Sequence, residues 1–204
     1  DNDSLLLVTY AEPLPEWNIN SFLGLYNSAS KVWLYDRKLM SPPKWYTSVF
    51  TPPQIYNNFV YANVGVSIVC HDLMSGEQIW KRDFESDFSF SGFSIVEDKL
   101  IASCENEILY CLNPDTGRII WQTAGSGTSS RLAYLNGIVY FVGGGDGKLH
   151  AVEVATGKTV WLLDGEKYFD SMFAAYNPVY VFPAKNGEPA KVIALSLGSA
   201  YCFE

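Results

Sequence analysis

Cys111-Leu-Asn-Pro-Asp-Thr-Gly-Arg-Ile-Ile-Trp121 is one of three copies of one motif. The other two copies are Cys70-His-Asp-Leu-Met-Ser-Gly-Glu-Gln-Ile-Trp80 and Ala151-Val-Glu-Val-Ala-Thr-Gly-Lys-Thr-Val-Trp161. Each copy has a small first residue, then an acid or amide, a glycine and a final tryptophan, and the tryptophans stand 41 and 40 residues apart. Self-similarity at a fixed period predicts a protein built from repeated structural units.

A β-hairpin pattern precedes each copy, and no stretch shows the 3.6-residue periodicity of a helix. The last clear copy belongs to a unit with four short predicted strands, Leu132–Tyr134, Ile138–Val142, Leu149–Val154 and Thr159–Leu163. The strands are apolar on both faces, which is typical of small sheets that stack on one another. Four strands in about 41 residues predict the blade of a β-propeller.

Weaker copies flank the three clear ones. Leu5–Tyr10, Phe22–Tyr26 and Lys31-Val-Trp33 resemble a first repeat, and Pro178–Phe182, Lys191–Leu195 and Ala200–Phe203 a fifth that has a shortened turn and no tryptophan. We therefore predict an all-β fold, one β-propeller domain over 1–204 with four-stranded antiparallel blades at about 4–38, 52–86, 92–124, 131–165 and 172–204. Either five blades close, or the chain forms part of a seven- or eight-bladed propeller. Because the sequence begins at Asp1 rather than methionine, we expect a mature or excised product.

Composition excludes several classes of protein. Hydrophobic residues make up 48% of the chain and charged residues 18%, so it can bury a core and is not disordered. The net charge of −8 disfavours nucleic acid as a partner. No apolar run approaches the roughly 18 residues of a membrane span.

The motif resembles the repeat of the quinoprotein, or pyrroloquinoline-quinone-like (PQQ-like), β-propellers, over roughly residues 52–164. The resemblance implies that Trp80, Trp121 and Trp161 are docking tryptophans, each packing against the neighbouring blade. It also implies that Gly76, Gly117 and Gly157 adopt positive φ in the tight turn before the outermost strand, where a Cβ would be strained. These implied roles are structural.

The family contains both cofactor-bearing dehydrogenases and propellers without a cofactor, including a scaffold of outer-membrane barrel assembly. The dehydrogenases have eight blades, a vicinal disulfide, and calcium-binding and base carboxylates in the central funnel. This chain has no adjacent cysteine pair and too few repeats for eight blades. The resemblance therefore implies a non-catalytic member without a cofactor, in the periplasm or outside the cell.

The cysteines and histidines predict no catalytic or metal site. Cys70 and Cys111 share one repeat position, which indicates a small buried residue between blades. A turn at Glu105-Asn106 would place Cys104 opposite Glu107, which disfavours a local disulfide. The redox state of all four cysteines, Cys202 included, stays open. His71 and His150 occupy unlike positions in their repeats, so we expect no shared metal site.

Three further patterns favour structural interpretations. Gly143–Gly147 precedes a predicted strand rather than a helix, so it indicates a hairpin turn instead of a phosphate-binding loop. Asn113–Gly117 hints at a calcium loop, but the twelfth position is Ala124 rather than a glutamate. The third pattern consists of two acidic clusters, each in the link after a tryptophan strand. Such clusters could serve glycoside hydrolysis but are more typical of solvated loops. Their members are Asp83, Glu85 and Asp87, then Asp164, Glu166 and Asp170.

Function is predicted from the links between blades. Trp33 and Trp80 are 47 residues apart, and the surplus falls in Leu39–Pro53, a proline-rich loop that carries Trp45, Tyr46 and Phe50. These aromatics either form a partner-binding patch or cap the neighbouring blade. A second aromatic link has the same two interpretations and contains Tyr168, Phe169, Phe173 and Tyr176.

The leading hypothesis is a non-catalytic scaffold that binds a protein or peptide partner through inter-blade loops. The alternatives are a fragment or relative of a PQQ-dependent dehydrogenase, and a carbohydrate-binding propeller. The sequence leaves the oligomeric state open.

Overall fold

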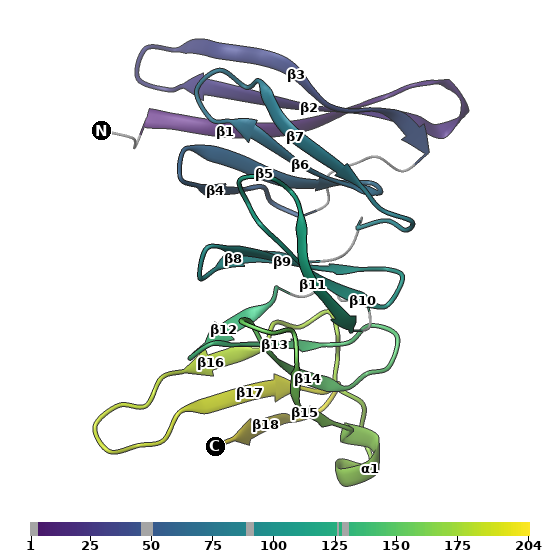
Figure 1. Cartoon of the computed structure of the whole chain (residues 1–204), viewed down its shortest axis with the longest axis vertical. Coiled ribbons are helices and arrows are strands. Elements are labelled where there is room, and N and C mark those ends of the chain that lie inside the picture. Colours follow the sequence, from purple (N-terminus) through teal and green to yellow (C-terminus); the bar gives the residue numbers. More distant parts are fainter. Residues whose placement is uncertain (1–3, 46–50, 89–91, 126, 128–130) are drawn as a thin grey trace. The chain divides into compact units, whose positions relative to one another are not determined.

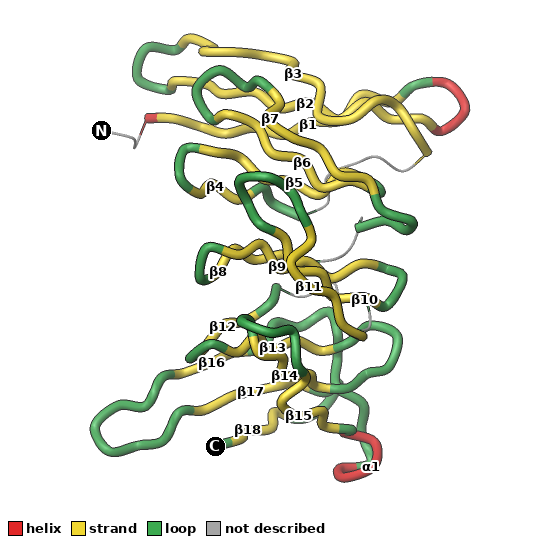
Figure 2. The backbone as a smooth tube through the Cα atoms, viewed as in Figure 1, coloured by secondary structure: helices red, strands yellow, loops and turns green. Residues whose placement is uncertain are grey.

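The computed structural model describes residues 4–45, 51–88, 92–125, 127 and 131–204. The chain divides into two compact units, Asp1–Ser89 and Phe90–Glu204, and each is described by itself. Both units consist of strands joined by turns and loops (Figure 2).

The first unit contains two antiparallel sheets (Figure 1). One sheet has three strands, β1 (Leu5–Pro13), β2 (Asn18–Asn27) and β3 (Val32–Trp45), with a short 3₁₀ turn, Pro15–Trp17, after β1. The other sheet has four strands, β4 (Gln54–Tyr56), β5 (Phe59–Val64), β6 (Ser67–Asp72) and β7 (Gln78–Asp83). A core cluster that includes Leu25, Met40 and Val69 draws residues from both sheets.

The described residues of the second unit form three antiparallel sheets and one short helix. The first sheet has strands β8 (Phe93–Val96), β9 (Lys99–Cys104), β10 (Ile108–Leu112) and β11 (Ile119–Ala124). The second has β12 (Ala133–Leu135), β13 (Ile138–Val142), β14 (Leu149–Glu153) and β15 (Thr159–Leu163). Helix α1 (Gly165–Phe169) follows, and the third sheet has β16 (Tyr180–Phe182), β17 (Lys191–Leu195) and β18 (Ala200–Phe203).

The middle strands of the β12–β15 sheet are buried on both faces, because a core cluster lies on either side of this sheet. In β10 and β14, four of the five residues are buried, whereas β11 alternates between half-buried and exposed residues. One core cluster, with Ile101, Cys111 and Phe141, lies between the first two sheets of the second unit. Another, with Tyr140 and Val192, lies between its last two sheets. The predicted all-β fold of stacked antiparallel sheets is thus confirmed, with four strands in three sheets and three strands in the other two.

Part of the predicted loop Leu39–Pro53 is in fact strand. β3 continues to Trp45, and its pairs with β2 include Ser21 with Ser41 and Ile19 with Lys44. No pair involves Pro42 or Pro43, and the register shifts between these two pairs. Proline has no N–H to donate, so the strand accommodates both prolines at this irregularity.

The last strand also differs from expectation. β16 contacts β12, the first strand of the preceding sheet, so β16 corresponds to the first strand of a four-stranded sheet. β18 then corresponds to the third strand rather than to the outer fourth strand, which carries the tryptophan in the regular repeats. The expectation that Ala200–Phe203 takes the place of a tryptophan strand was wrong. Cys202 pairs with Ile193 as Ala151 pairs with Tyr140. Tyr201-Cys202-Phe203-Glu204 therefore corresponds to Tyr110-Cys111-Leu112-Asn113, a similarity that the spacing of the tryptophans does not show.

Candidate functional site

The acid or amide of each motif organises the turn that follows it. Asn113 Oδ1 accepts hydrogen bonds from the backbone N–H and the hydroxyl of Thr116, both at 2.9 Å. Asp72 Oδ1 accepts hydrogen bonds from Ser75 N at 2.8 Å and from Met74 N at 3.0 Å. These bonds, of which the one from Ser75 has the larger effect, hold the pKa of Asp72 below its usual value. The side-chain oxygen at this position of the motif therefore closes a turn between strands. Its place in the motif does not indicate a metal ligand.

Trp121 contacts the equivalent turn of the next sheet. Its Nε1–H donates to Val154 O at 3.0 Å, and its ring lies against Gly157. A Cβ on Gly157 would come within 2.6 Å of Trp121 Cδ2, and φ at this glycine is +74°. The turn therefore needs glycine both for its backbone conformation and for the approach of the indole. The other two motif glycines, Gly76 and Gly117, also have positive φ.

In the first unit, Tyr35 takes the position that Trp121 has in the second. Tyr35 pairs with Leu25 as Trp121 pairs with Cys111, and its hydroxyl donates to Leu73 O at 3.0 Å. A Cβ on Gly76 would lie 2.7 Å from Tyr35 Cε2. Burial, with a smaller contribution from the charge of Asp72, raises the pKa of Tyr35 to about 12.

Trp33, which the sequence suggested as the tryptophan of the first repeat, has another environment. Its ring lies 5.2 Å from that of Tyr26, tilted by 60°, and it fills the space beside Gly24. It is also 43% exposed. The docking residue of this sheet is thus two positions further along the strand.

Trp80 and Trp161 pack against tyrosines of their own sheets. Trp80 pairs with Cys70, and its ring lies 6.1 Å from that of Tyr61. Trp161 lies 5.8 Å from the Tyr140 ring and packs on the core cluster between the last two sheets. Both tryptophans are half-buried, as expected of a residue on the outer strand.

The four cysteines are free thiols, with Cys70, Cys104 and Cys111 buried and Cys202 exposed. Cys104 pairs with Ile108, so its predicted position opposite Glu107 was wrong by one residue. Burial raises the pKa of Cys111 to about 12, which makes this thiol unreactive at neutral pH.

The two histidines lie in different units and have different partners. The His71 ring makes a 2.9 Å hydrogen bond through Nδ1 to Gly76 O, and burial lowers the pKa of His71. His150 stacks on Phe141 with ring centroids 4.7 Å apart, and its Nε2 lies 3.0 Å from Asp146 Oδ2. Within the described ranges, no three His, Cys, Asp or Glu side chains are grouped to hold a metal ion.

Members of both acidic clusters make structural contacts. Asp83 accepts a hydrogen bond from Ser67 at 2.6 Å and pairs with Lys81 at 3.0 Å. Asp164 caps α1 by accepting from Lys167 N at 3.2 Å and pairs with Lys148 at 3.3 Å. The hydrogen bond from Lys167 N has the largest effect on the pKa of Asp164 and lowers it, as do smaller contributions that include Lys148. A catalytic general acid needs a raised pKa instead.

The first predicted partner patch falls largely outside the described part of the chain. Tyr46 and Phe50 are not among the described residues. The backbone of Trp45 ends β3, opposite Asn18, and its side chain lies outside the description too.

The second aromatic link, around α1, is described. Phe173 is buried, whereas Phe169 stacks on Tyr201 with ring centroids 4.5 Å apart. The exposed fraction is 60% for Tyr168, 51% for Met172 and 85% for Tyr176. We call these three side chains the α1 surface. Sequence reasoning had included both tyrosines but not Met172.

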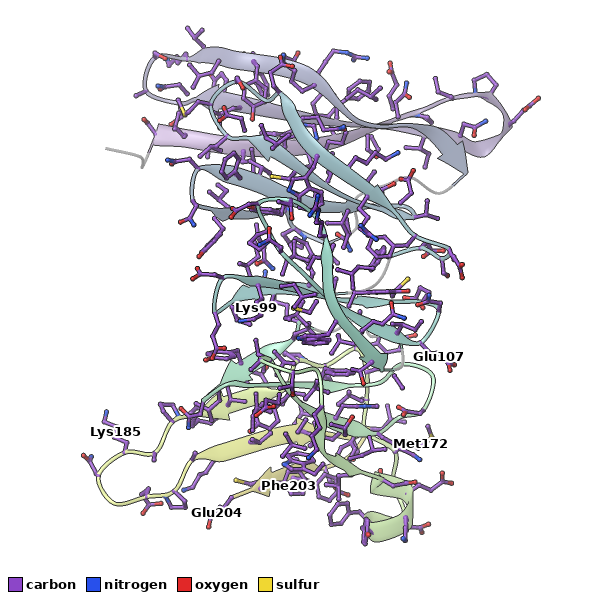
Figure 3. All side chains as sticks on the ribbon, viewed as in Figure 1. Lys99, Glu107, Met172, Lys185, Phe203 and Glu204 are labelled. Carbon is purple, nitrogen blue, oxygen red and sulfur yellow. The ribbon has the colours of Figure 1, made fainter. Side chains whose placement is uncertain are left out.

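The α1 surface adjoins a pocket in the same unit. Met172 packs on Gly147 of the β13–β14 turn, and Phe173 N donates to Gly147 O at 3.1 Å. The neighbouring residue, Asp146, lines a pocket of about 270 Å³. Figure 3 shows Met172 and Glu107, another lining residue, on the side of the sheets where α1 lies. The remaining lining residues are Ala124, Gly125, Gly145, His150, Thr159 and Leu162.

Small stacked sheets with an aromatic docking residue and a glycine turn define the class of β-propeller repeat proteins. The chain belongs to the PQQ-like repeat family described as "Outer membrane protein assembly factor BamB", whose model matches residues 45–123 and 105–198. Among the described residues, no helix is long and apolar enough to cross a membrane.

A curated relative is similar to the chain in sequence, and two solved structures are similar to it in fold. Outer membrane protein assembly factor BamB of Shewanella oneidensis is 27% identical over 131 residues, 58% of this chain and 33% of the relative. BamB from Moraxella catarrhalis has a TM-score of 0.65 at 14% identity, over 97% of this chain and 64% of that one. Quinohemoprotein alcohol dehydrogenase from Comamonas testosteroni has a TM-score of 0.50 at 19% identity, over 56% and 21%. The chain thus spans about a third of the length of its curated relative.

Proposed function

We propose that this chain is a non-catalytic scaffold that binds a protein partner during the assembly of outer membrane proteins, in the cell envelope. The family description and the BamB relative support this process. The observation that carries the binding role is the α1 surface, where Tyr168 and Tyr176 expose 60% and 85% of their surface on a link between sheets. Exposed aromatic and methionine side chains are enriched in protein interfaces.

The environment of this surface suits binding rather than catalysis. The link is fixed to the sheets through Asp164, which both caps α1 and pairs with Lys148, and through the buried Phe173. The exposed rings therefore project from an anchored support, which reduces the entropy lost when a partner binds.

Affinity capture tests the proposal. The tagged chain, produced in the periplasm of a Gram-negative host, is used to capture proteins from solubilised envelopes. We expect outer-membrane assembly proteins to be retained by the unaltered chain and to bind the double variant Tyr168→Ala/Tyr176→Ala at least about 30-fold more weakly, because a hot-spot aromatic contributes about 2 kcal/mol or more. Lys185→Ala, on the exposed β16–β17 turn, is the matched control. Equal retention by the double variant would contradict the proposed surface.

The dehydrogenase alternative has a separate test. A ligand that binds only the native state raises the melting temperature by mass action. We expect pyrroloquinoline quinone with calcium to leave the melting temperature unchanged. A saturable rise of several degrees would replace the scaffold proposal with a cofactor-dependent one.

A further inference from the structure

The pocket beside the α1 surface is lined by residues that have no part in the function proposed above. It lies between two sheets of the second unit: Glu107 and Gly125 come from the β8–β11 sheet, and Asp146, His150 and Leu162 from the β12–β15 sheet. His150 is 94% buried, since its exposed fraction is 6%. A polar ring held at such depth and hydrogen-bonded to the Asp146 carboxylate indicates a formed site rather than a chance surface hollow.

The charged and imidazole groups of the pocket present hydrogen-bond acceptors. Although burial opposes ionisation of Asp146, hydrogen bonds from His150 and Lys148 N and nearby positive charge keep its pKa below the usual value. Asp146 is therefore a carboxylate at neutral pH, so the short contact requires His150 Nε2 to carry the proton. In the neutral ring this leaves Nδ1 as an acceptor, to which no described residue donates.

Lys148, whose charge helps to lower the pKa of Asp146, forms no ion pair with that carboxylate. The backbone N–H of Lys148 donates to Asp146 Oδ1 at 3.1 Å, but its ammonium pairs with Asp164. The Glu107 carboxylate makes no ion pair with any other described residue. The pocket therefore offers carboxylate and imidazole acceptors, which suit a ligand rich in N–H donors.

The size and the apolar wall of the pocket narrow the choice of ligand. Cofactors and drug-sized ligands occupy pockets of roughly 300–1,000 Å³, whereas this one has about 270 Å³. Leu162, which is 48% exposed, and Ala124 line it beside the acceptors. One long side chain with an aliphatic stem and a cationic head fits this combination.

We propose that the pocket binds the guanidinium group of an arginine side chain of the protein partner, a proposal that rests on the proposed function. The guanidinium offers five N–H donors in a planar fork and no acceptor. It would bond to the carboxylates of Asp146 and Glu107, while the aliphatic stem lies along Leu162. Met172 is adjacent, so a segment with arginine next to apolar residues would contact the pocket and the α1 surface together.

Peptide titration tests this proposal directly. The probe is an acetylated and amidated Gly-Leu-Arg-Leu-Gly peptide, and its matched control contains citrulline, which has nearly the same shape but no charge. We expect the arginine peptide to bind with a millimolar dissociation constant and to shift the His150 ring nitrogen resonances. The citrulline peptide should bind about 10-fold more weakly, because it lacks the charge that strengthens hydrogen bonds to carboxylates.

Two variants assign the binding to this pocket. Asp146→Asn should weaken binding of the arginine peptide about 10-fold. Glu107→Gln should weaken binding less. Glu107→Gln also avoids the risk to folding that a change at Asp146, beside the buried His150, carries. Glu188→Gln, on the β16–β17 turn, should have no effect. Equal binding of the two peptides, or binding that Glu107→Gln and Asp146→Asn both leave unchanged, would overturn the proposal.

The outcomes separate this proposal from the scaffold function. If envelope proteins are captured through the α1 surface but the arginine peptide does not bind, the pocket assignment fails and the scaffold stands. If the peptide binds and capture fails, the pocket stands and the scaffold function fails.

Discussion

At the residue scale, an aromatic side chain and a glycine in the next turn join neighbouring sheets. Trp121 with Gly157 and Tyr35 with Gly76 use the same geometry, although one aromatic is a tryptophan and the other a tyrosine. The tryptophan pattern therefore predicted the position in one sheet and missed it in the other. In both cases the aromatic side chain donates a hydrogen bond to a carbonyl of the turn. The indole N–H of Trp121 donates to Val154 O, and the hydroxyl of Tyr35 donates to Leu73 O.

Replacement of Gly157 by alanine should destabilise the second unit. A non-glycine residue at positive φ costs about 1–2 kcal/mol, and the added Cβ would also displace the Trp121 ring. We expect a loss of at least about 2 kcal/mol in urea unfolding followed by tryptophan fluorescence. Gly198→Ala is the control, because its Cβ would meet nothing within 4 Å. Equal effects of both changes would refute the docking role of this turn.

Tyr35 should contribute to unfolding at high pH. Its pKa of about 12 in the folded protein lies above the usual 10.0, so its contribution to stability is complete below pH 10 and is lost as the pH rises toward 12. Tyr35→Phe should make the decline in unfolding free energy between pH 10 and 12 shallower. Cys111 still titrates in this range, so the decline will not vanish. An unchanged slope would contradict the buried environment of Tyr35.

Thiol labelling should distinguish Cys202 from the other cysteines. Cys202 is exposed, whereas Cys70, Cys104 and Cys111 are buried. With a thiol reagent at neutral pH, we expect one fast-reacting group in the native protein and four after denaturation. Cys202→Ser should remove the fast phase, and a fast phase that persists would show that a buried thiol is accessible.

At the scale of elements, sequence patterns located strands well where the repeat is regular. The predicted Ile138–Val142 and Thr159–Leu163 coincide with β13 and β15. The extension of β3 was missed because Pro42-Pro43 suggested a loop. Helix α1 was missed because five residues are too few to show helical periodicity.

The α1 link depends on its cap, which two substitutions can dissect. Asp164→Ala removes the bond from Lys167 N and the ion pair with Lys148, and loss of a cap costs about 0.5–2 kcal/mol. We expect faster amide hydrogen exchange in residues 165–171. Asp164→Asn keeps a capping oxygen and should retain most of the protection. If both variants exchange alike, the ion pair rather than the cap stabilises the link.

At the scale of the whole molecule, the sequence predicted the family and the stacked sheets but only part of the candidate site. The repeat is a property of the chain itself, so a single sequence reveals it. The pocket depends on side chains that are distant in sequence and meet across two sheets, such as Glu107 and Asp146. The sequence patterns indicated no role for His150 beyond the exclusion of a metal site shared with His71, and no spacing rule connects it with Glu107.

A photo-reactive amino acid at position 176 tests the central claim, that the α1 surface binds a protein in the cell envelope, most directly. Tyr176 is 85% exposed, so the substitution leaves the core intact, and position 185 provides the control. After irradiation of intact cells, we predict a discrete adduct with an outer-membrane assembly protein from position 176 and none from position 185. No adduct from position 176, or the same adduct from both positions, would contradict the account.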